Sequence, residues 1–130
     1  MVSIENSEAR FLNPYEARRI NVVDLGFASI NDYMASDTWR RIKRETLAEC
    51  GYECYACGMY ADQVHHSSYD TAVLSGRDTS HLYPVCDACH KWAHSGTHKI
   101  LPPGVATARL TNARNTRLRS RRQLRSERNL

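Results

Sequence analysis

The sequence predicts a small α+β domain that depends on a bound metal ion for its fold. Three observations predict it: two short extended segments lie between helical ones, four of the five cysteines form two CxxC pairs, and large core-forming residues are few. With 130 residues, the chain has room for one domain plus tails. Because it contains only two Phe and two Trp, we expect a modest hydrophobic core that needs help from another source.

The clearest helical segment runs from Ser36 to Cys50. Ser36 or Asp37 suits the N-cap position, because either side chain can accept a hydrogen bond from a free N–H of the first turn. One face of this helix is expected to be buried, because the following residues recur at helical spacing: Trp39, Ile42, Thr46, Leu47 and Cys50. Since Cys50 lies on that face outside the CxxC pairs, we expect a buried thiol. A shorter helix is expected over Glu16–Val23, ended by Gly26.

Two extended segments and a second helix follow. Residues 64–68 alternate in polarity well enough for a short strand, and residues 82–85 form a second candidate. Pro84 favours an edge or irregular position for that second strand. Cys86 to Ser95 is expected to be a cysteine-bearing turn that runs into a helix, with Gly96 placed as the left-handed residue after its end.

Charge is distributed very unevenly along the chain. Residues 1–105 contain ten Lys and Arg against thirteen Asp and Glu, whereas residues 106–130 contain eight Arg and one acidic residue. Such a basic segment fits a polyanion such as nucleic acid, or is simply solvated. We expect it to be disordered or to form a helix on a partner. The chain is therefore divided into an N-terminal extension (1–32), a folded domain (33–101) and a basic C-terminal tail (102–130).

The two CxxC pairs predict a structural zinc site made by Cys54, Cys57, Cys86 and Cys89. Because the N-terminus is polar, we expect no secretion signal. No apolar run approaches the ~18 residues that a membrane span needs, so we expect no membrane-spanning segment. We therefore expect an intracellular chain whose thiols stay reduced. A pair of redox motifs is the main alternative, but such a motif needs a βαβ context that this chain lacks. Zinc bound here would contribute about 10–16 kcal/mol to folding.

Five of the six histidines fall within residues 65–94, which is more than a packed core needs. His90 and His94 are four residues apart on the expected helix, so both project from one face and can share an ion. A histidine at the end of a helix, stabilised by the helix dipole, is the alternative for His94. On a strand, His65 and His66 point to opposite faces, so we expect them to have different roles.

The run CYACG…VHHSSYD…HLYPVCDACHKWAH resembles the ββα-metal core of HNH endonucleases, the group that includes the colicin DNases. The preceding stretch SDTWRRIKRETLAECGYEC is similar to the helix before the first CxxC in many phage and bacterial HNH proteins. The resemblance covers roughly residues 33–95. It implies a ββα-metal (HNH) core with a four-cysteine zinc knuckle, in the cytoplasm of a bacterial or phage-infected cell.

The same resemblance implies a role for each histidine. His65 matches the metal ligand just before the base, and His66 matches the general base that activates water. His90 matches the last histidine of the signature, a metal ligand, and His94 matches the extra metal-binding histidine of the colicin-type members. His81 occupies the place of the family's central Asn, which orients the base-carrying loop or helps to hold the metal. A histidine can also donate a hydrogen bond there, and a plain loop residue is the alternative.

The function implied is a metal-dependent endonuclease that hydrolyses phosphodiester bonds in DNA, with the Arg-rich tail adding sequence-independent affinity for the duplex. A near-neutral imidazole at His66 can take a proton from water. A divalent ion held by three imidazoles can bind a phosphate oxygen and the leaving oxygen. The candidates are Mg²⁺, Mn²⁺, Ni²⁺ and Zn²⁺, of which the transition metals suit nitrogen ligands better.

Two other functions fit the same residues. A catalytically inactive zinc module could bind nucleic acid or a protein, and it would bind one metal ion where the nuclease binds two. A nuclease directed at RNA has the same motifs as one directed at DNA. The sequence contains no legible element that reads bases and no indication of the oligomeric state.

Overall fold

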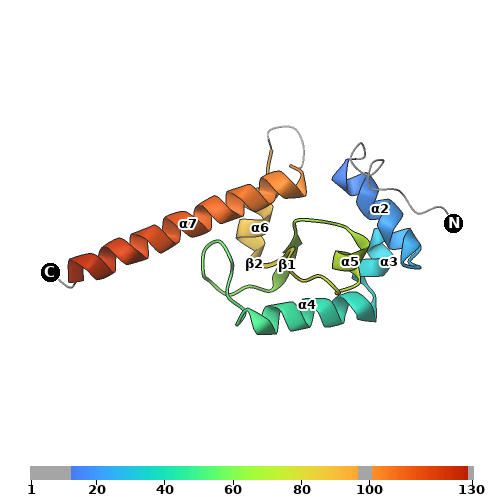
Figure 1. Ribbon diagram of the computed structural model, residues 1–130, viewed down its shortest axis with the longest axis horizontal. Coiled ribbons are helices and arrows are strands. Elements are labelled where there is room, and N and C mark those ends of the chain that lie inside the picture. The colour runs from blue at the N-terminus through green and yellow to red at the C-terminus, as the bar shows by residue number, and fades with distance from the viewer. Residues whose placement is uncertain (1–12, 97–100, 129–130) are drawn as a thin grey trace.

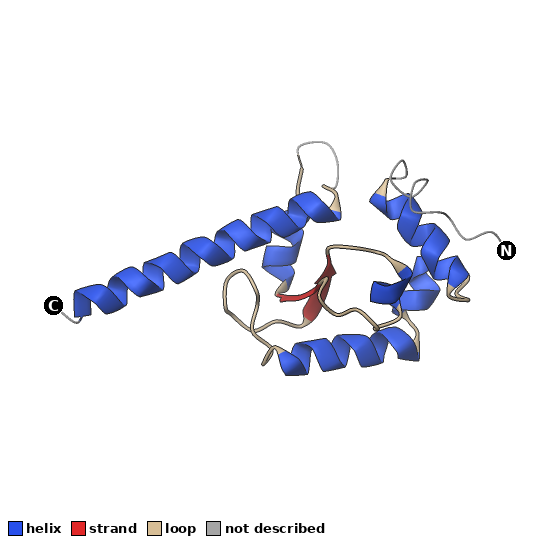
Figure 2. Ribbon diagram, in the orientation of Figure 1, coloured by secondary structure: helices blue, strands red, loops and turns tan. Residues whose placement is uncertain are grey.

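The computed structural model describes residues 13–96 and 101–128. Its elements follow in the order α2 (Pro14–Asp24), α3 (Ile30–Met34), α4 (Asp37–Glu49), β1 (Gln63–His66), α5 (Thr71–Leu74), β2 (Leu82–Val85), α6 (Asp87–His94) and α7 (Pro103–Arg128). The two strands lie at the centre, with α4 along one side and α7 extending away from the body (Figure 1). The described part is thus a small α+β fold in which helices predominate, as Figure 2 shows.

Strands β1 and β2 form a two-stranded antiparallel sheet in which Pro84 pairs with Val64. Strand β2 has the predicted bounds, whereas β1 begins one residue earlier and ends two residues earlier than the predicted 64–68. The edge position explains why Pro84 is tolerated. Proline has no N–H to donate, and among the described residues no second strand lies beside β2 that would need this donor. Successive side chains of β1 point to opposite faces. His65 accordingly faces α6 and α7, whereas His66 faces α4, so the prediction of opposite faces is confirmed.

Helix α4 begins at the predicted cap and buries the predicted face. The Ser36 side chain accepts a hydrogen bond from the N–H of Trp39. The helix packs on both strands through the following buried residues: Trp39, Ile42, Thr46 and Leu47. The loop before β2 approaches this face closely at Gly76, where a Cβ atom would lie 2.9 Å from Cγ1 of Ile42. Gly76 also has a φ of +83°, so glycine is required there for two reasons.

Two local predictions are wrong. Cys50 is exposed, because α4 ends at Glu49 and its C-cap residue falls beyond the buried stripe. Helix α6 lacks the helical C-cap residue that precedes a left-handed glycine, because Ser95 already has an extended backbone with φ −72° and ψ 126°. The Ser95 hydroxyl instead donates to the carbonyl oxygen of Trp92 at 2.6 Å, which satisfies part of the last turn.

Tyr33 attaches the N-terminal helices to the body. Its side chain is fully buried, and its hydroxyl donates to the carbonyl oxygen of Leu74 at 2.7 Å. The ring lies edge-on to Phe27 and also packs against Trp39, at centroid distances of 5.3 and 5.8 Å. Helix α2 covers the segment where the sequence predicts a short helix, and Gly26 follows it with a φ of +96°.

The arginine-rich segment is one continuous helix, α7, whose first turns pack on the domain. Pro103, Ala106 and Leu110 are buried, and the helix packs against α6. This differs from the expected disorder or partner-induced helix, because small and apolar residues before Arg114 give the helix an apolar face. Its remaining turns project beyond the body (Figure 1). Among the described helices, none is long and apolar enough to cross a membrane.

The Tyr33 contact gives a stability prediction. Tyr33→Phe leaves the Leu74 carbonyl oxygen buried without a donor, so we expect the free energy of unfolding to fall by about 1–3 kcal/mol. Chemical denaturation measures this change. Tyr60→Phe is the matched control, since Tyr60 is 69% exposed, and it should change stability by less than about 0.5 kcal/mol. Equal stability of Tyr33→Phe and the unmodified chain would contradict the prediction.

Candidate metal centres and the adjoining pocket

Four cysteine side chains gather at one point although they come from two segments. Cys54 and Cys57 follow α4, Cys86 is the N-cap residue of α6, and Cys89 lies in its first turn. The four sulfur atoms lie within 4.8 Å of one another, and Cys57 Sγ is 3.8 Å from Cys86 Sγ. Thiolates around a tetrahedral zinc ion are also about 3.8 Å apart. The cysteines therefore form the predicted cluster, with a spacing consistent with structural zinc.

The surroundings of the cluster favour a bound cation. The backbone N–H of Cys89 donates to Cys86 Sγ at 3.4 Å. Burial raises the pKa of the Cys54 thiol, but hydrogen bonds from three backbone N–H groups outweigh burial and lower it to about 7. Burial and the neighbouring sulfur atoms raise the pKa of Cys89. The Cys54 thiol thus ionises more readily than the Cys89 thiol. A bound cation would stabilise the thiolate form of all four cysteines, so that they could ionise together.

Strand β1 and helix α6 bring three imidazole rings together. His65 extends from β1, while His90 and His94 lie one turn apart on α6. One nitrogen atom of each ring lies within 4.8 Å of the other two, and the ring centroids are 5.1–5.5 Å apart. His65 is only 1% exposed. The three histidines could therefore hold a metal ion together, as predicted.

A hydroxyl on α7 determines which nitrogen of His65 carries the proton. Thr107 donates its hydroxyl hydrogen to the carbonyl oxygen of Pro103 at 2.7 Å. The same hydroxyl oxygen lies 2.8 Å from His65 Nε2 and can then only accept. His65 therefore donates through Nε2–H, and its Nδ1 keeps a free lone pair.

The other two rings are oriented in the same way. His90 Nδ1 lies 2.9 Å from the side-chain oxygen of Gln63, whose amide nitrogen donates to Asp87 at 2.9 Å. His94 Nδ1 lies 2.9 Å from the carbonyl oxygen of Leu101. Both partners are acceptors, so each ring donates through Nδ1–H and leaves Nε2 free. Such partners fix the tautomer and orientation of metal-binding histidines.

The free nitrogens point at one another, which is unfavourable without a cation between them. His65 Nδ1 and His94 Nε2 are 3.3 Å apart. Nitrogen ligands of a tetrahedral zinc ion are separated by about 3.3–3.4 Å. A shared proton is disfavoured, because burial, with smaller contributions from the neighbouring histidines, lowers the pKa of His65 to about 3. The distances between the three rings therefore suit a bound metal ion.

His66 lies on the opposite face of β1, between two aromatic rings. Trp39 and Tyr69 flank its imidazole at centroid distances of 4.9 and 5.4 Å. Its Nε2 atom is buried and has no hydrogen-bond partner among the described residues. Burial, with smaller contributions from the charges of His90 and Arg18, lowers the pKa of His66 to about 4. The ring is therefore neutral at pH 7.

An open pocket of about 760 Å³ lies beside His66 and beside His90 and His94 of the histidine cluster. Helices α2 and α6 and the end of β1 contribute most of its walls. It is lined by Tyr15, Arg18, Met34, Val64, His66, Tyr69, His90, Lys91, His94 and Ser95. A ligand in this pocket would reach His66 and two of the three clustered histidines at once.

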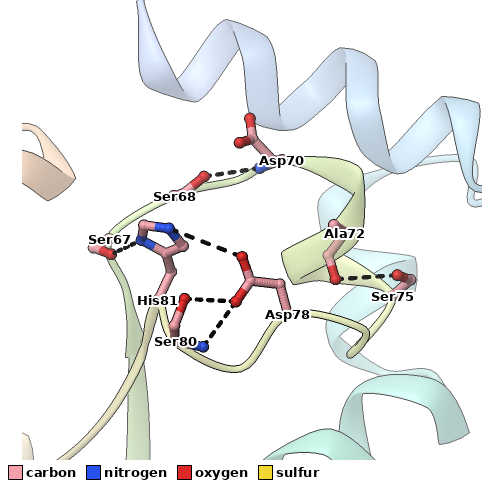
Figure 3. A network of polar contacts seen from close by, with 8 residues as sticks. All are labelled: Ser67, Ser68, Asp70, Ala72, Ser75, Asp78, Ser80 and His81. Atoms are coloured by element: carbon pink, nitrogen blue, oxygen red, sulfur yellow. Dashed lines mark hydrogen bonds and ion pairs between the residues drawn. The ribbon is translucent and has the colours of Figure 1, made fainter.

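His81 lies outside the histidine cluster, in the loop before β2. Its Nδ1 is 2.7 Å from the hydroxyl of Ser67, and its carbonyl oxygen accepts from the Ser67 N–H at 2.9 Å. Figure 3 shows this contact and a second one, in which His81 Nε2 lies 4.0 Å from a carboxylate oxygen of Asp78. Because Ser67 directly follows His66, His81 ties the residue after the proposed base to the opposite side of the loop. His81 is thus not one of the three histidines that could hold an ion, and its side chain contacts the residue that follows His66.

Three residues of this region have no role predicted from the sequence. Thr107 and Gln63 orient metal-facing rings, but their contacts with the histidines span 42 and 27 residues, so no local pattern reports them. Arg18 lines the pocket from α2. Arg18 follows Tyr15 by three residues, and side chains at i and i+3 are neighbours on a helix. This spacing could have indicated that Arg18 lies beside the Tyr15 ring.

Comparisons of the chain with protein-family models, curated proteins and solved structures find no match. The function must therefore be argued from the residues and from the geometry that brings them together.

The orienting hydroxyl predicts a metal-affinity effect. Thr107→Val keeps the shape of the side chain but removes the acceptor for His65 Nε2–H, so we expect metal affinity at the histidine site to fall by about 10–100-fold. Titration with Co²⁺ separates this site from the thiolate site by its spectrum. Thr116→Val is the control, because Thr116 makes the same type of bond, to the Asn112 carbonyl oxygen, on an exposed face. Unchanged affinity in Thr107→Val would contradict the assigned tautomer.

Proposed function

We propose that this chain is a metal-dependent endonuclease of the HNH type that hydrolyses phosphodiester bonds in DNA. One observation carries the proposal: His66 lines the same pocket as His90 and His94, which turn free nitrogens towards a common point with His65. The order β1–β2–α6, with the cysteine cluster at the start of α6, supports it because it agrees with the ββα-metal arrangement that the sequence resembles.

In this proposal, His66 accepts a proton from the attacking water. The ring is neutral at pH 7, and so has a lone pair available for the proton. Packing between Trp39 and Tyr69 fixes the plane of the imidazole. His81 acts as a positioning residue, because its bonds to Ser67 hold the segment that directly follows the base.

Two metal ions with different duties complete the proposal. The four cysteines would hold a structural Zn²⁺ ion, and His65, His90 and His94 would hold a divalent ion (Mg²⁺, Mn²⁺, Ni²⁺ or Zn²⁺). When bound, the divalent ion supplies positive charge for a phosphate oxygen and for the leaving oxygen. Three neutral imidazoles leave the full charge of that ion to the phosphate, and they favour a transition metal over Mg²⁺.

Helix α7 supports duplex DNA as the partner. Its 26 residues span about 39 Å. From residue 114 onwards, arginines recur every three or four residues along one face of the helix, namely Arg114, Arg117, Arg121, Arg125 and Arg128. The first two donate to carbonyl oxygens of the cysteine-bearing turn, which shows that this face is turned towards the body. The last three continue it as exposed cations beyond the body, at a spacing suited to a phosphate backbone.

Loss of the proposed base tests the nuclease function. We expect His66→Ala to lower the rate of plasmid nicking by about 10²–10⁴-fold in the presence of Mn²⁺ or Ni²⁺. His66→Gln should lose a similar factor while filling the space between the flanking rings. Metal content and thermal melting of both variants serve as controls for folding, since the thiolate site should still bind zinc. Nicking at the original rate by folded His66→Gln would rule out the assigned base.

Metal stoichiometry separates the nuclease from the inactive zinc module. The proposal expects two ions per chain, of which the one held by histidines exchanges faster. A single ion per chain in active preparations would exclude the histidine site as the catalytic centre. Cleavage of RNA in preference to DNA of matched sequence would redirect the substrate assignment.

The exposed arginines of α7 predict a salt effect on DNA binding. Replacing Arg121, Arg125 and Arg128 together by Gln should weaken duplex binding and reduce the slope of log affinity against log salt by up to about 0.9 for each lost phosphate contact. Fluorescence anisotropy measures this slope. The matched control replaces three arginines of α4 by Gln, namely Arg40, Arg41 and Arg44. It removes the same amount of charge, and Arg40 and Arg41 already pair with acidic residues. An equal change in both variants would contradict a specific role for α7.

A further inference from the structure

The pocket beside the histidines contains a positive charge that the proposed chemistry leaves unused. Arg18, on α2, lines this pocket together with His66 and His90. Its Nε atom is buried and has no hydrogen-bond partner among the described residues. Burying such an N–H without an acceptor is costly, and native proteins rarely leave one unpaired. A ligand that brings an acceptor into the pocket would satisfy it.

Two tyrosines hold the guanidinium of Arg18 in place. Its Cζ lies 5.0 Å from the ring centroid of Tyr15 and 5.3 Å from that of Tyr69. Contacts with aromatic faces fix a guanidinium without neutralising its charge, and the Nε–H of Arg18 keeps no partner among the described residues. Tyr15 is itself anchored, because its hydroxyl donates to the carbonyl oxygen of Leu101 at 3.0 Å. The cation is therefore positioned before a ligand arrives.

The charges around the pocket favour an anion. No carboxylate is among the described residues that line it. The other cation of the lining, Lys91, pairs with Asp87 at 2.9 Å, whereas Arg18 forms no ion pair within the described part of the chain. A planar guanidinium with free in-plane donors matches two oxygens of one phosphate group.

We propose that Arg18 is a phosphate-binding residue, and that the pocket between α2 and α6 seats a phosphate group of a nucleic-acid substrate. The identity of the substrate rests on the proposed nuclease function, whereas the phosphate site is defined by the pocket alone. The proposal assigns substrate binding to the N-terminal extension, for which the sequence predicts no function.

Inorganic phosphate is the first probe, added to the full ¹⁵N-labelled chain with its zinc site loaded. We expect the Nε–H resonance of Arg18 to shift saturably with phosphate and not with chloride at the same ionic strength. Arg18→Gln should abolish the accompanying shifts of His66 and His90, and Arg18→Lys should weaken binding because it lacks the planar fork. Arg19→Gln is the control, since Arg19 is the next residue on α2 and is exposed. Phosphate binding of unchanged affinity in Arg18→Gln, or no saturable shift at Arg18, would overturn the proposal.

DNA cleavage is the second readout and separates the two proposals. We expect Arg18→Gln to lower kcat by about 10²-fold with little change in KM, because α7 continues to hold the duplex. Arg18→Met keeps the packing between the tyrosines and should be equally impaired; full activity in this variant would overturn the proposal. If the unmodified chain cuts no DNA, the nuclease proposal fails, and the phosphate titration alone decides the role of Arg18.

Discussion

The convergence of four thiols on one point is the constraint on which the rest of the molecule depends. It joins the turn after α4 to the first turn of α6, two segments that the short hairpin alone would hold only weakly. Cys89 and His90 are neighbours in the chain, so an ion that fixes the start of α6 also fixes the rotation of that helix about its axis. That rotation places His90 and His94 opposite His65. The histidine site is therefore a geometric consequence of the cysteine site.

Helix α7 is the second support, because it contacts both centres. Arg114 and Arg117 donate to the carbonyl oxygens of Tyr55 and Ala56 at 3.1 and 3.0 Å, which secures the cysteine-bearing turn from outside. Three turns earlier, Thr107 orients His65. The composition of this helix indicates only a polyanion partner, yet its residues 103–117 also contribute to the fold. Its charges divide into cations that hold backbone carbonyl groups and cations that remain exposed.

The sequence predicts those parts of the site whose geometry is local. The CxxC and H-x3-H spacings describe a turn and one face of a helix, so the four cysteines and the pair of His90 and His94 could be grouped from spacing alone. The place of His65 beside that pair came only from the resemblance, because β1 and α6 meet through the fold and not through a local pattern. Contacts between distant segments could not be identified, and the bond between Tyr15 and Leu101 spans 86 residues. Cys50 shows where helical periodicity fails as a guide. It continues the spacing of the buried residues of α4, but the helix ends one residue before it, so its side chain is exposed. Whether α7 is folded depends on the surface against which its apolar turns pack.

The histidine cluster and Arg18 present opposite needs within one pocket. The facing lone pairs of His65 and His94 need a cation, since burial disfavours a proton there, and the packing of α7 and Leu101 holds them in that arrangement. The unpaired N–H of Arg18 needs an acceptor. A phosphodiester carries two non-bridging oxygens, so it can bind a metal ion through one and a guanidinium through the other. With a cation held by the histidines, such a ligand would place one oxygen on that ion and the other on Arg18, and would bring its phosphorus atom beside His66.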